Sequence, residues 1–91
     1  MYDVQYHPRV VHEDISKLDG AYRRRIKRSI EQKLTTDPET FGIPLRRSLK
    51  GYRKLRVGDY RVIFHISGAT VYILAILHRS IVYVRVSQRF R

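Results

Sequence analysis

The sequence predicts an α+β fold with the order β-α-α-β-β-β, followed by a terminal element. Two segments between residues 9 and 35 repeat apolar side chains at helical spacing. Further along, two segments alternate apolar and polar residues as strands do, a third is apolar throughout, and glycine-containing turns separate them. We therefore expect an antiparallel sheet with two helices packed on one face.

Composition limits the class of protein. The chain has 91 residues, of which 43% are hydrophobic, enough for one core, so we expect residues 1–91 to form a single domain. The absence of cysteine excludes disulfides, thiolate catalysis and zinc–cysteine sites. No apolar run is long enough to span a bilayer, and the first residues lack the layout of a signal peptide. We expect a soluble cytoplasmic protein.

The first elements are a strand and two helices. Apolar and polar residues alternate over residues 2–6, and Pro8 stops strand pairing and suits the opening of a helix. The apolar spacing then predicts helices over roughly 9–18 and 20–35, with a break at Asp19-Gly20. Each helix has one apolar face, so each has one side to bury.

The second half of the chain predicts a sheet. A polar loop runs to about Leu49 and is followed by strands around 54–57, 60–66 and 71–77. The last of these is apolar on both faces, as expected of a central strand. Residues 80–91 are ambiguous, because their β-branched residues favour a strand whereas the serine at their start can cap a short helix.

The charge of the chain points to an anionic partner. Nineteen Lys and Arg residues against 8 Asp and Glu give a net charge of +11, and self-repulsion on this scale favours binding of an anion. We rank RNA or DNA first and an acidic protein second. An anionic membrane comes last, because the cations do not lie opposite an apolar, aromatic helix face.

Cations concentrate on the predicted strands. Five lie within twelve residues: Lys50, Arg53, Lys54, Arg56 and Arg61. The period of two places Lys54, Arg56 and Arg61 on the face opposite the two helices, and we expect His78 and Arg79 near them. A solvated face that only aids solubility is the alternative. Arg61, however, lies inside an apolar strand and needs an anion there, and with so few acids in the chain an external phosphate is a reasonable one.

A second group of polar residues follows the apolar strand. His78 can shuttle protons, Arg79 can hold a phosphate by two parallel hydrogen bonds, and Tyr83 can stack on a base. The alternative is a helix N-terminus with a chance histidine and a packed tyrosine. Tyr52 and Tyr60 can flank the basic face and stack on bases, although core packing is the commoner role of a tyrosine.

Several other chemistries are excluded by the pattern of residues. The histidines and carboxylates have no spacing typical of a metal site or of two-metal cleavage, and no glycine-rich phosphate loop or nucleophile elbow occurs. We therefore expect no metal and no cofactor. Any catalysis would depend mainly on cations.

Two segments, residues 49–64 and 77–83, together resemble the RelE branch of the RelE/ParE toxin superfamily. The family pattern is Leu-x-Gly, then Lys/Arg-Leu-Arg, then Tyr-Arg before apolar residues, and after one strand His-Arg-x-x-Val-Tyr. In this chain the pattern reads Leu49-Lys50-Gly51, Lys54-Leu55-Arg56, Tyr60-Arg61 and His78-Arg79-Ser80-Ile81-Val82-Tyr83. The order of elements matches the family over the whole chain, and the resemblance favours a helix for the terminal element.

The resemblance implies a ribosome-dependent mRNA endoribonuclease, an mRNA interferase, from a type II toxin–antitoxin system. Cleavage in the family is metal-free attack of the 2′-hydroxyl on the adjacent phosphorus. By position, Lys54 would activate that hydroxyl or hold the phosphate, and Arg61 would stabilise the charge at phosphorus. Arg79 would lie near the leaving 5′-oxygen, Tyr83 would stack on or orient the substrate, and His78 is a candidate acid or base.

One position departs from the family pattern. The well-known RelE pattern has a second lysine two residues before the one matching Lys54, and here that position is Tyr52. Which group deprotonates the nucleophile is therefore open. Lys50, Tyr52, Arg53 and Arg56 are the candidate RNA-binding residues around the catalytic set.

Two other functions remain as alternatives. A ParE-like inhibitor of DNA gyrase without nuclease activity would share the fold and the charge, and a non-catalytic RNA- or ribosome-binding module would share the charge. Gyrase-directed members generally lack the full set of Lys54, Arg61, Arg79 and Tyr83, and the presence of that set here favours the nuclease.

The resemblance also implies partners. These are a cognate antitoxin with an acidic segment, the ribosome with mRNA in its A site, and promoter DNA only as the toxin–antitoxin complex. No membrane partner is expected, and the free toxin is expected to be a monomer.

Overall fold

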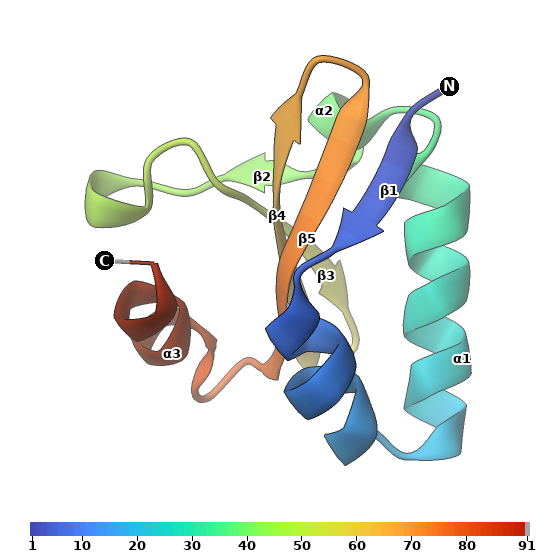
Figure 1. The fold of residues 1–91 in the computed structure, drawn as a ribbon, viewed down its shortest axis with the longest axis vertical. Coiled ribbons are helices and arrows are strands. Elements are labelled where there is room, and N and C mark those ends of the chain that lie inside the picture. The colour runs from blue at the N-terminus through green and yellow to red at the C-terminus, as the bar shows by residue number, and fades with distance from the viewer. Residues whose placement is uncertain (91) are drawn as a thin grey trace.

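The computed structural model describes residues 1–90 as a five-stranded sheet with helices on both faces (Figure 1). The strands lie in the order β1-β5-β4-β3-β2. Their bounds are β1 (Asp3–Tyr6), β2 (Ile43–Pro44), β3 (Arg53–Val57), β4 (Tyr60–Ser67) and β5 (Thr70–His78). The α+β class and the order of the predicted strands are confirmed.

The sheet is mixed, whereas an antiparallel sheet was predicted. Strands β3, β4 and β5 form the expected antiparallel meander, but β1 pairs in parallel with β5, with Asp3 opposite Thr70 and Tyr6 opposite Ile73. Parallel neighbours need a long crossover between them. The helical segments together with β2, β3 and β4 supply that crossover. Alternation within residues 2–6 shows that they form a strand but carries no information about the direction of its pairing.

Helical segments precede and follow the meander. They are η1 (Val10–Asp14), η2 (Ile15–Lys17), α1 (Gly20–Ser29), η3 (Ile30–Leu34), α2 (Pro38–Phe41), η4 (Arg47–Leu49) and α3 (Val82–Arg89). The first predicted helix is a π-helical turn followed by a 3-10 turn, not a regular α-helix. The second begins after Asp19, whose carboxylate accepts a 2.8 Å hydrogen bond from the Tyr22 amide and so caps α1.

The segment predicted as a polar loop carries three short elements. The turn α2, the two-residue strand β2 and the turn η4 all lie between the second helix and β3. Ile43 and Pro44 pair with Lys54 and Arg53 of β3. Proline is tolerated there because β2 is the edge of the sheet, and the strand is too short for an alternating pattern to signal it.

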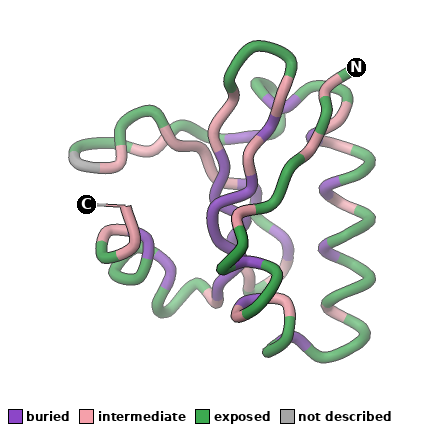
Figure 2. Tube along the Cα trace, viewed as in Figure 1, coloured by how far each residue is buried: buried purple, intermediate pink, exposed green. Residues whose placement is uncertain are grey.

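Each face of the sheet has its own core. On the first face Val10, Ile26 and Ile30 pack against buried residues of the sheet such as Phe64 and Ile73. On the opposite face, Val82 and Val86 of α3 are fully buried against Ile63, Ala75 and Leu77. Figure 2 shows the buried residues concentrated along the central strands and the inner sides of the helices. The two helices predicted on one face are confirmed, while the single core expected from length is wrong because α3 covers the second face.

A buried ion pair fixes α3 to the rest of the molecule. Arg89 bonds the Asp14 carboxylate with both terminal nitrogens, at 2.9 and 2.5 Å, and the two side chains are only 5% and 2% exposed. Asp14 also accepts a 2.9 Å bond from the backbone amide of Ile76. The hydrogen bond with Asp14 raises the pKa of Arg89. Residues 14, 76 and 89, from η1, β5 and α3, thus form one polar junction.

No helix within residues 1–90 is both long and apolar enough to cross a membrane.

Candidate functional site

An open cavity of about 410 Å³ lies where β3, β4 and the turn between β5 and α3 meet. Six residues line it: Lys54, Arg61, His78, Arg79, Ser80 and Tyr83. The structure therefore brings together the five residues predicted as catalytic, although up to 29 positions separate them in the chain. Ser80 is an addition, since the sequence marked it only as a helix cap.

Arg61 is the buried cation of the cavity. It is 8% exposed, and one terminal nitrogen donates 2.9 Å hydrogen bonds to the carbonyl oxygens of both Gly58 and Tyr60. These two bonds hold the guanidinium in one orientation. Among residues 1–90 no carboxylate lies within ion-pair distance of it, so its charge is available to an anion in the cavity.

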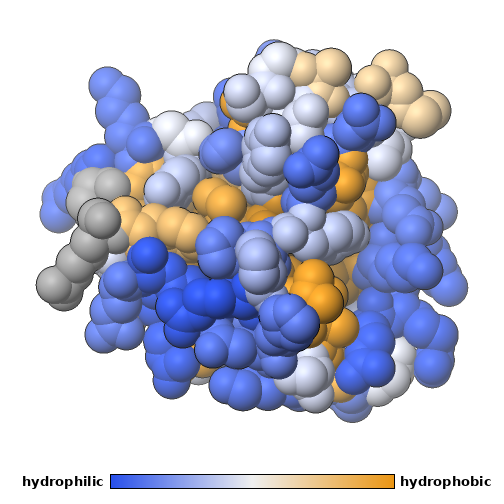
Figure 3. Space-filling model, in the orientation of Figure 1, coloured by the Kyte–Doolittle hydropathy of each residue, from blue (hydrophilic) through white to orange (hydrophobic). Residues whose placement is uncertain are grey.

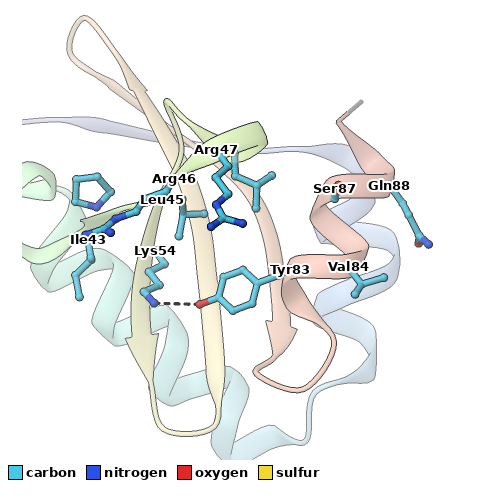
Figure 4. A pocket seen from close by; sticks show the side chains of 11 residues that line it. Ile43, Leu45, Arg46, Arg47, Lys54, Tyr83, Val84, Ser87 and Gln88 are labelled. Carbon is cyan, nitrogen blue, oxygen red and sulfur yellow. Dashed lines mark hydrogen bonds between the residues drawn. The ribbon is translucent and has the colours of Figure 1, made fainter.

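Lys54 and Tyr83 join β3 to α3 across the cavity. The Lys54 Nζ donates a 3.0 Å hydrogen bond to the Tyr83 hydroxyl, drawn as a dashed line in Figure 4. The ammonium also lies 5.6 Å from the centroid of the Tyr83 ring. The tyrosine is 40% exposed and the lysine is half-buried, so both groups are accessible from the cavity. A docked α3 is therefore needed to complete this side of the cavity.

Arg79 lies at the exposed rim of the cavity. Its Nε is 3.6 Å from an Asp59 carboxylate oxygen, and the two side chains are 63% and 59% exposed. An ion pair so open to water contributes little and exchanges readily for another anion. A phosphate entering the cavity can therefore displace Asp59 from Arg79.

His78 lines the cavity from the last position of β5, but the strand register turns its side chain to the face opposite that of Arg61, whereas the two were expected on one face. In the register of the sheet Arg61 pairs with Leu77 and His78 pairs with Tyr60, so the two side chains alternate. The Tyr60 ring lies edge-on to the imidazole at 5.6 Å. The backbone amide of Ser80 donates to the His78 Nδ1 at 3.2 Å, and a neutral ring with that acceptor carries its proton on Nε2.

The predicted RNA-binding residues divide into two groups. Arg56 pairs with Arg61 across the strands, shares its face and is exposed, and Lys50 is exposed in the turn after η4. Arg53 instead donates to the carbonyl oxygens of Glu39 and Gly42, at 3.1 and 3.0 Å. It precedes Lys54 in β3, and the alternation of side chains turns it to the opposite face.

The two tyrosines considered for base stacking pack inside the molecule. Tyr52 contacts His65 and Phe90, with ring centroids 6.4 and 5.9 Å away. Tyr60 contacts Tyr22 edge-on at 4.7 Å. Neither residue is among those that line the cavity, and Tyr83 is the tyrosine that does.

A larger groove of about 770 Å³ adjoins the cavity. One wall is the segment from Ile43 to Leu49 and the other is α3, and the groove shares Lys54 and Tyr83 with the cavity (Figure 4). Sequence reasoning missed it because the segment before β3 read as a featureless loop. Figure 3 shows hydrophilic side chains over most of the face of the molecule seen in Figure 1.

The acids and histidines of residues 1–90 form no cluster of three that could hold a metal ion. The charged residues that line the cavity are the cations Lys54, Arg61 and Arg79. Their arrangement suits the binding of a phosphate and the stabilisation of added negative charge on it.

Comparison with known proteins identifies the family. The model of the ParE toxin of type II toxin–antitoxin systems, parDE, matches residues 4–83. The chain belongs to the RelE/ParE superfamily of type II toxins. A comparison with curated protein sequences finds no match.

Solved structures of RelE/ParE toxins support the assignment. The toxin–antitoxin complex RelBE2 from Mycobacterium tuberculosis contains a chain 31% identical to this toxin, with a TM-score of 0.80 over 86% of this chain and 98% of that chain. A chain of the RelB–RelE complex from Methanococcus jannaschii is 27% identical, with a TM-score of 0.67 over 88% and 95% of the two chains.

A third similar structure bears on the fold alone. A mutant of the Escherichia coli toxin RelE in the free state is 18% identical to this toxin, with a TM-score of 0.72 over 99% of this chain and 98% of that chain. The resemblance to the superfamily and to its fold, inferred from sequence, is thereby confirmed. The matching family model is that of ParE, while these three structures are of RelE proteins.

Proposed function

We propose that this toxin is a ribosome-dependent mRNA endoribonuclease. The observation that supports the proposal is the meeting of Lys54, Arg61, Arg79 and Tyr83 at one cavity. Such a set is what cleavage of a phosphodiester by its own 2′-hydroxyl requires, because negative charge grows on the phosphate as the reaction proceeds.

In the proposed reaction the 2′-oxygen attacks the adjacent phosphorus while the bond from phosphorus to the 5′-oxygen breaks. The products are a 2′,3′-cyclic phosphate and a 5′-hydroxyl. The 2′-hydroxyl gives up one proton and the leaving 5′-oxygen takes one, so no water and no redox partner are consumed. Arg61, held by two backbone carbonyls, is preorganised to bind the phosphate oxygens. Arg79 is placed at the rim to stabilise the leaving oxygen.

The decisive experiment uses ribosomes programmed with a defined message, with and without toxin, and maps the 3′ ends of the mRNA. Arg61→Ala and Arg79→Ala should each lower cleavage about a hundredfold or more, as the loss of one stabiliser of developing charge does. Arg79 is an exposed residue, so its variant tests the chemistry without disturbing the fold.

The matched control is Arg85→Ala, which removes an exposed arginine of α3 that does not line the cavity. Its cleavage should equal that of the wild type. Message that stays intact on ribosomes that have bound wild-type toxin would refute the proposal.

A second candidate function is inhibition of DNA gyrase without nuclease activity. The match of residues 4–83 to the ParE family model favours it. A supercoiling assay with purified gyrase separates the two functions. Gyrase inhibition would be established by two results together. The Arg61→Ala and Arg79→Ala variants would still inhibit supercoiling, and the message on programmed ribosomes would stay intact.

The proposed partners follow from the charge and from the similar structures. We propose a cognate antitoxin with an acidic segment, because the chains similar to this toxin in two of these structures lie in toxin–antitoxin complexes. The ribosome with mRNA in its A site is the proposed target. We also propose that the toxin binds promoter DNA only as the toxin–antitoxin complex. The free toxin is proposed to be a monomer and to be located in the cytoplasm.

A further inference from the structure

The groove between the Ile43–Leu49 segment and α3 is not used by the proposed catalytic set. It is larger than the catalytic cavity, at about 770 against 410 Å³, and opens into the same region through Lys54 and Tyr83. A ligand that extends from the cavity past Lys54 and Tyr83 therefore enters the groove.

The lining of the groove combines cations with exposed apolar surface. Arg46, Arg47 and Lys54 contribute positive charge, and no acidic side chain is among the lining residues. Ile43 and Val84 line it with apolar side chains that are 57% and 63% exposed. A groove with cations for phosphates, an aromatic ring and apolar surface for bases is the usual design of a site for single-stranded nucleic acid.

Arg47 stands out by its backbone conformation. Its φ of 60° lies in the left-handed region, where glycine fits without strain and arginine does not. Figure 4 shows its side chain extending into the groove toward Tyr83. The strained position is explained if the guanidinium has a role in the groove.

RNA is a continuous chain, and this limits where the nucleotide beside the cut can lie. A strand whose scissile phosphate occupies the cavity continues by one backbone link into the neighbouring nucleotide, which must lie against the adjacent surface. The groove is the hollow that shares the two residues Lys54 and Tyr83 with the cavity. A peptide has no such requirement to occupy both places.

We infer that this groove holds the nucleotide next to the cut, with its base between Tyr83 and Arg47, and that Arg47 and Ser87 select the base. The inference rests on the proposed nuclease function and extends it to substrate selection. Bases stack on aromatic rings and on arginine planes, and a guanidinium and a hydroxyl can both bond a base edge. Ser87 lines the groove from α3.

The sharpest variant is Arg47→Gly. Glycine suits the positive φ, so this change should preserve or raise stability while it removes the side chain. On ribosomes programmed with every base at each position of the A-site codon, we expect its base preference to change at least about fivefold, with a larger effect on KM than on kcat. Ser87→Ala should shift the preference in the same assay. Arg85→Ala, which removes an exposed arginine of α3 that does not line the groove, is the control.

A direct test of occupancy uses mRNA that carries a 2′-O-methyl group at the cut position, which blocks attack, and 4-thiouridine at the neighbouring positions. Photocrosslinks should fall on peptides covering residues 43–49 and 83–88. Crosslinks that fall only outside these peptides would overturn the inference. So would a wild-type base preference and KM in both Arg47→Gly and Ser87→Ala. An unchanged preference with lost neutralisation by antitoxin would assign the groove to an antitoxin peptide and also overturn it.

Failure of the proposed function is distinguishable from failure of this inference. Wild-type toxin that cuts no message refutes the nuclease, and the crosslinks to the uncleavable RNA then decide whether the groove binds RNA. If cleavage requires Arg61 but its base preference and KM are unaffected by the Arg47 and Ser87 variants, only the inference is refuted.

Discussion

At the scale of single residues, Arg61 shows how a cation in a binding site differs from a cation on the surface. Burial of a cation without an acid is unfavourable, yet the guanidinium is 8% exposed and bonded to carbonyls of Gly58 and Tyr60. The fold therefore holds a partly desolvated positive charge beside an open cavity. Such a charge interacts more strongly with a phosphate than a charge in bulk water does.

The contact between Lys54 and Tyr83 leads to a prediction about coupling. Tyr83→Phe removes the acceptor of the 3.0 Å hydrogen bond but keeps the ring, so single-turnover cleavage should fall while base stacking is retained. The effects of Tyr83→Phe and Lys54→Ala should be non-additive by about 0.5–3 kcal/mol, because the two groups are in contact. A double-mutant cycle on the cleavage rate measures this term. Fully additive effects would mean that the contact plays no part in the reaction.

Gly42 gives a prediction about packing. A methyl group there would collide with the Phe64 ring, which is fully buried, and with the Pro38 carbonyl oxygen. Gly42→Ala should therefore lower the free energy of unfolding by about 1–3 kcal/mol, as overpacking does. Urea denaturation provides the measurement.

Gly20→Ala is the matched control for that experiment. Its new methyl would meet only the flexible end of Arg24, at 3.3 Å, and alanine favours the helix. Equal stability of the two variants would show that the region around Gly42 can relax.

At the scale of elements, α3 is the part of the molecule on which both hollows depend. It supplies Tyr83 to the cavity and one wall to the groove. Its apolar side covers the second core, and the ion pair between Asp14 and Arg89 anchors its far end. Any event that displaces α3 would therefore open the cavity and the groove together.

Removal of the anchor should be costly. Arg89→Ala leaves the Asp14 carboxylate buried with only the Ile76 amide as a partner among the bonds described. We expect a loss of about 3–5 kcal/mol in the free energy of unfolding, the usual result of breaking a buried pair from one side. Arg85→Ala, exposed on the same helix, should change it by less than about 0.5 kcal/mol. Similar midpoints for the two variants in thermal unfolding would contradict the anchoring role.

At the scale of the whole molecule, positive charge lies on both sides of the sheet. Besides the cavity, α1 carries five exposed cations: Arg23, Arg24, Arg25, Lys27 and Arg28. Figure 1 shows α1 and α3 on opposite sides of the sheet. A net charge of +11 on such a layout favours a partner that surrounds the toxin with phosphates.

The outer side of α1 leads to a prediction about salt dependence. The double variant with Arg24→Gln and Arg28→Gln should bind programmed ribosomes more weakly, and the slope of log affinity against log salt should become shallower by about two. Cleavage at saturating toxin should not change, because neither residue lines the cavity. An unchanged slope would show that Arg24 and Arg28 make no phosphate contact.

Much of the fold was predictable because its signals are local. Alternation identified β3 and β4, an unbroken apolar run identified β5, and spacing of apolar residues identified α1. The cations of the cavity were also found, since Arg61 in an apolar strand is anomalous wherever the strand lies. Whether residues 1–91 unfold as a single domain stays a prediction.

The residues that sequence reasoning misplaced share one cause. Arg53 and Tyr52 lie next to Lys54 in the chain, but the first bonds carbonyls near α2 and the second packs on His65 and Phe90. Proximity in sequence did not place either beside the cavity, because strand alternation turns Arg53 to the other face and rings from other elements hold Tyr52. The groove was missed for the same reason, since its two walls come from separate parts of the chain.

The sequence by itself determined the strands, the main helix, the excess of positive charge and the membership of a toxin superfamily, because each is written in short patterns of neighbouring residues. Only the tertiary structure decided the parallel pairing of β1, the second core, the meeting of the cations at the cavity and the junction of Asp14 with Arg89, which are 75 positions apart. Contacts over such separations depend on how whole elements pack, and a local pattern carries no information about which distant partner will fill a given space.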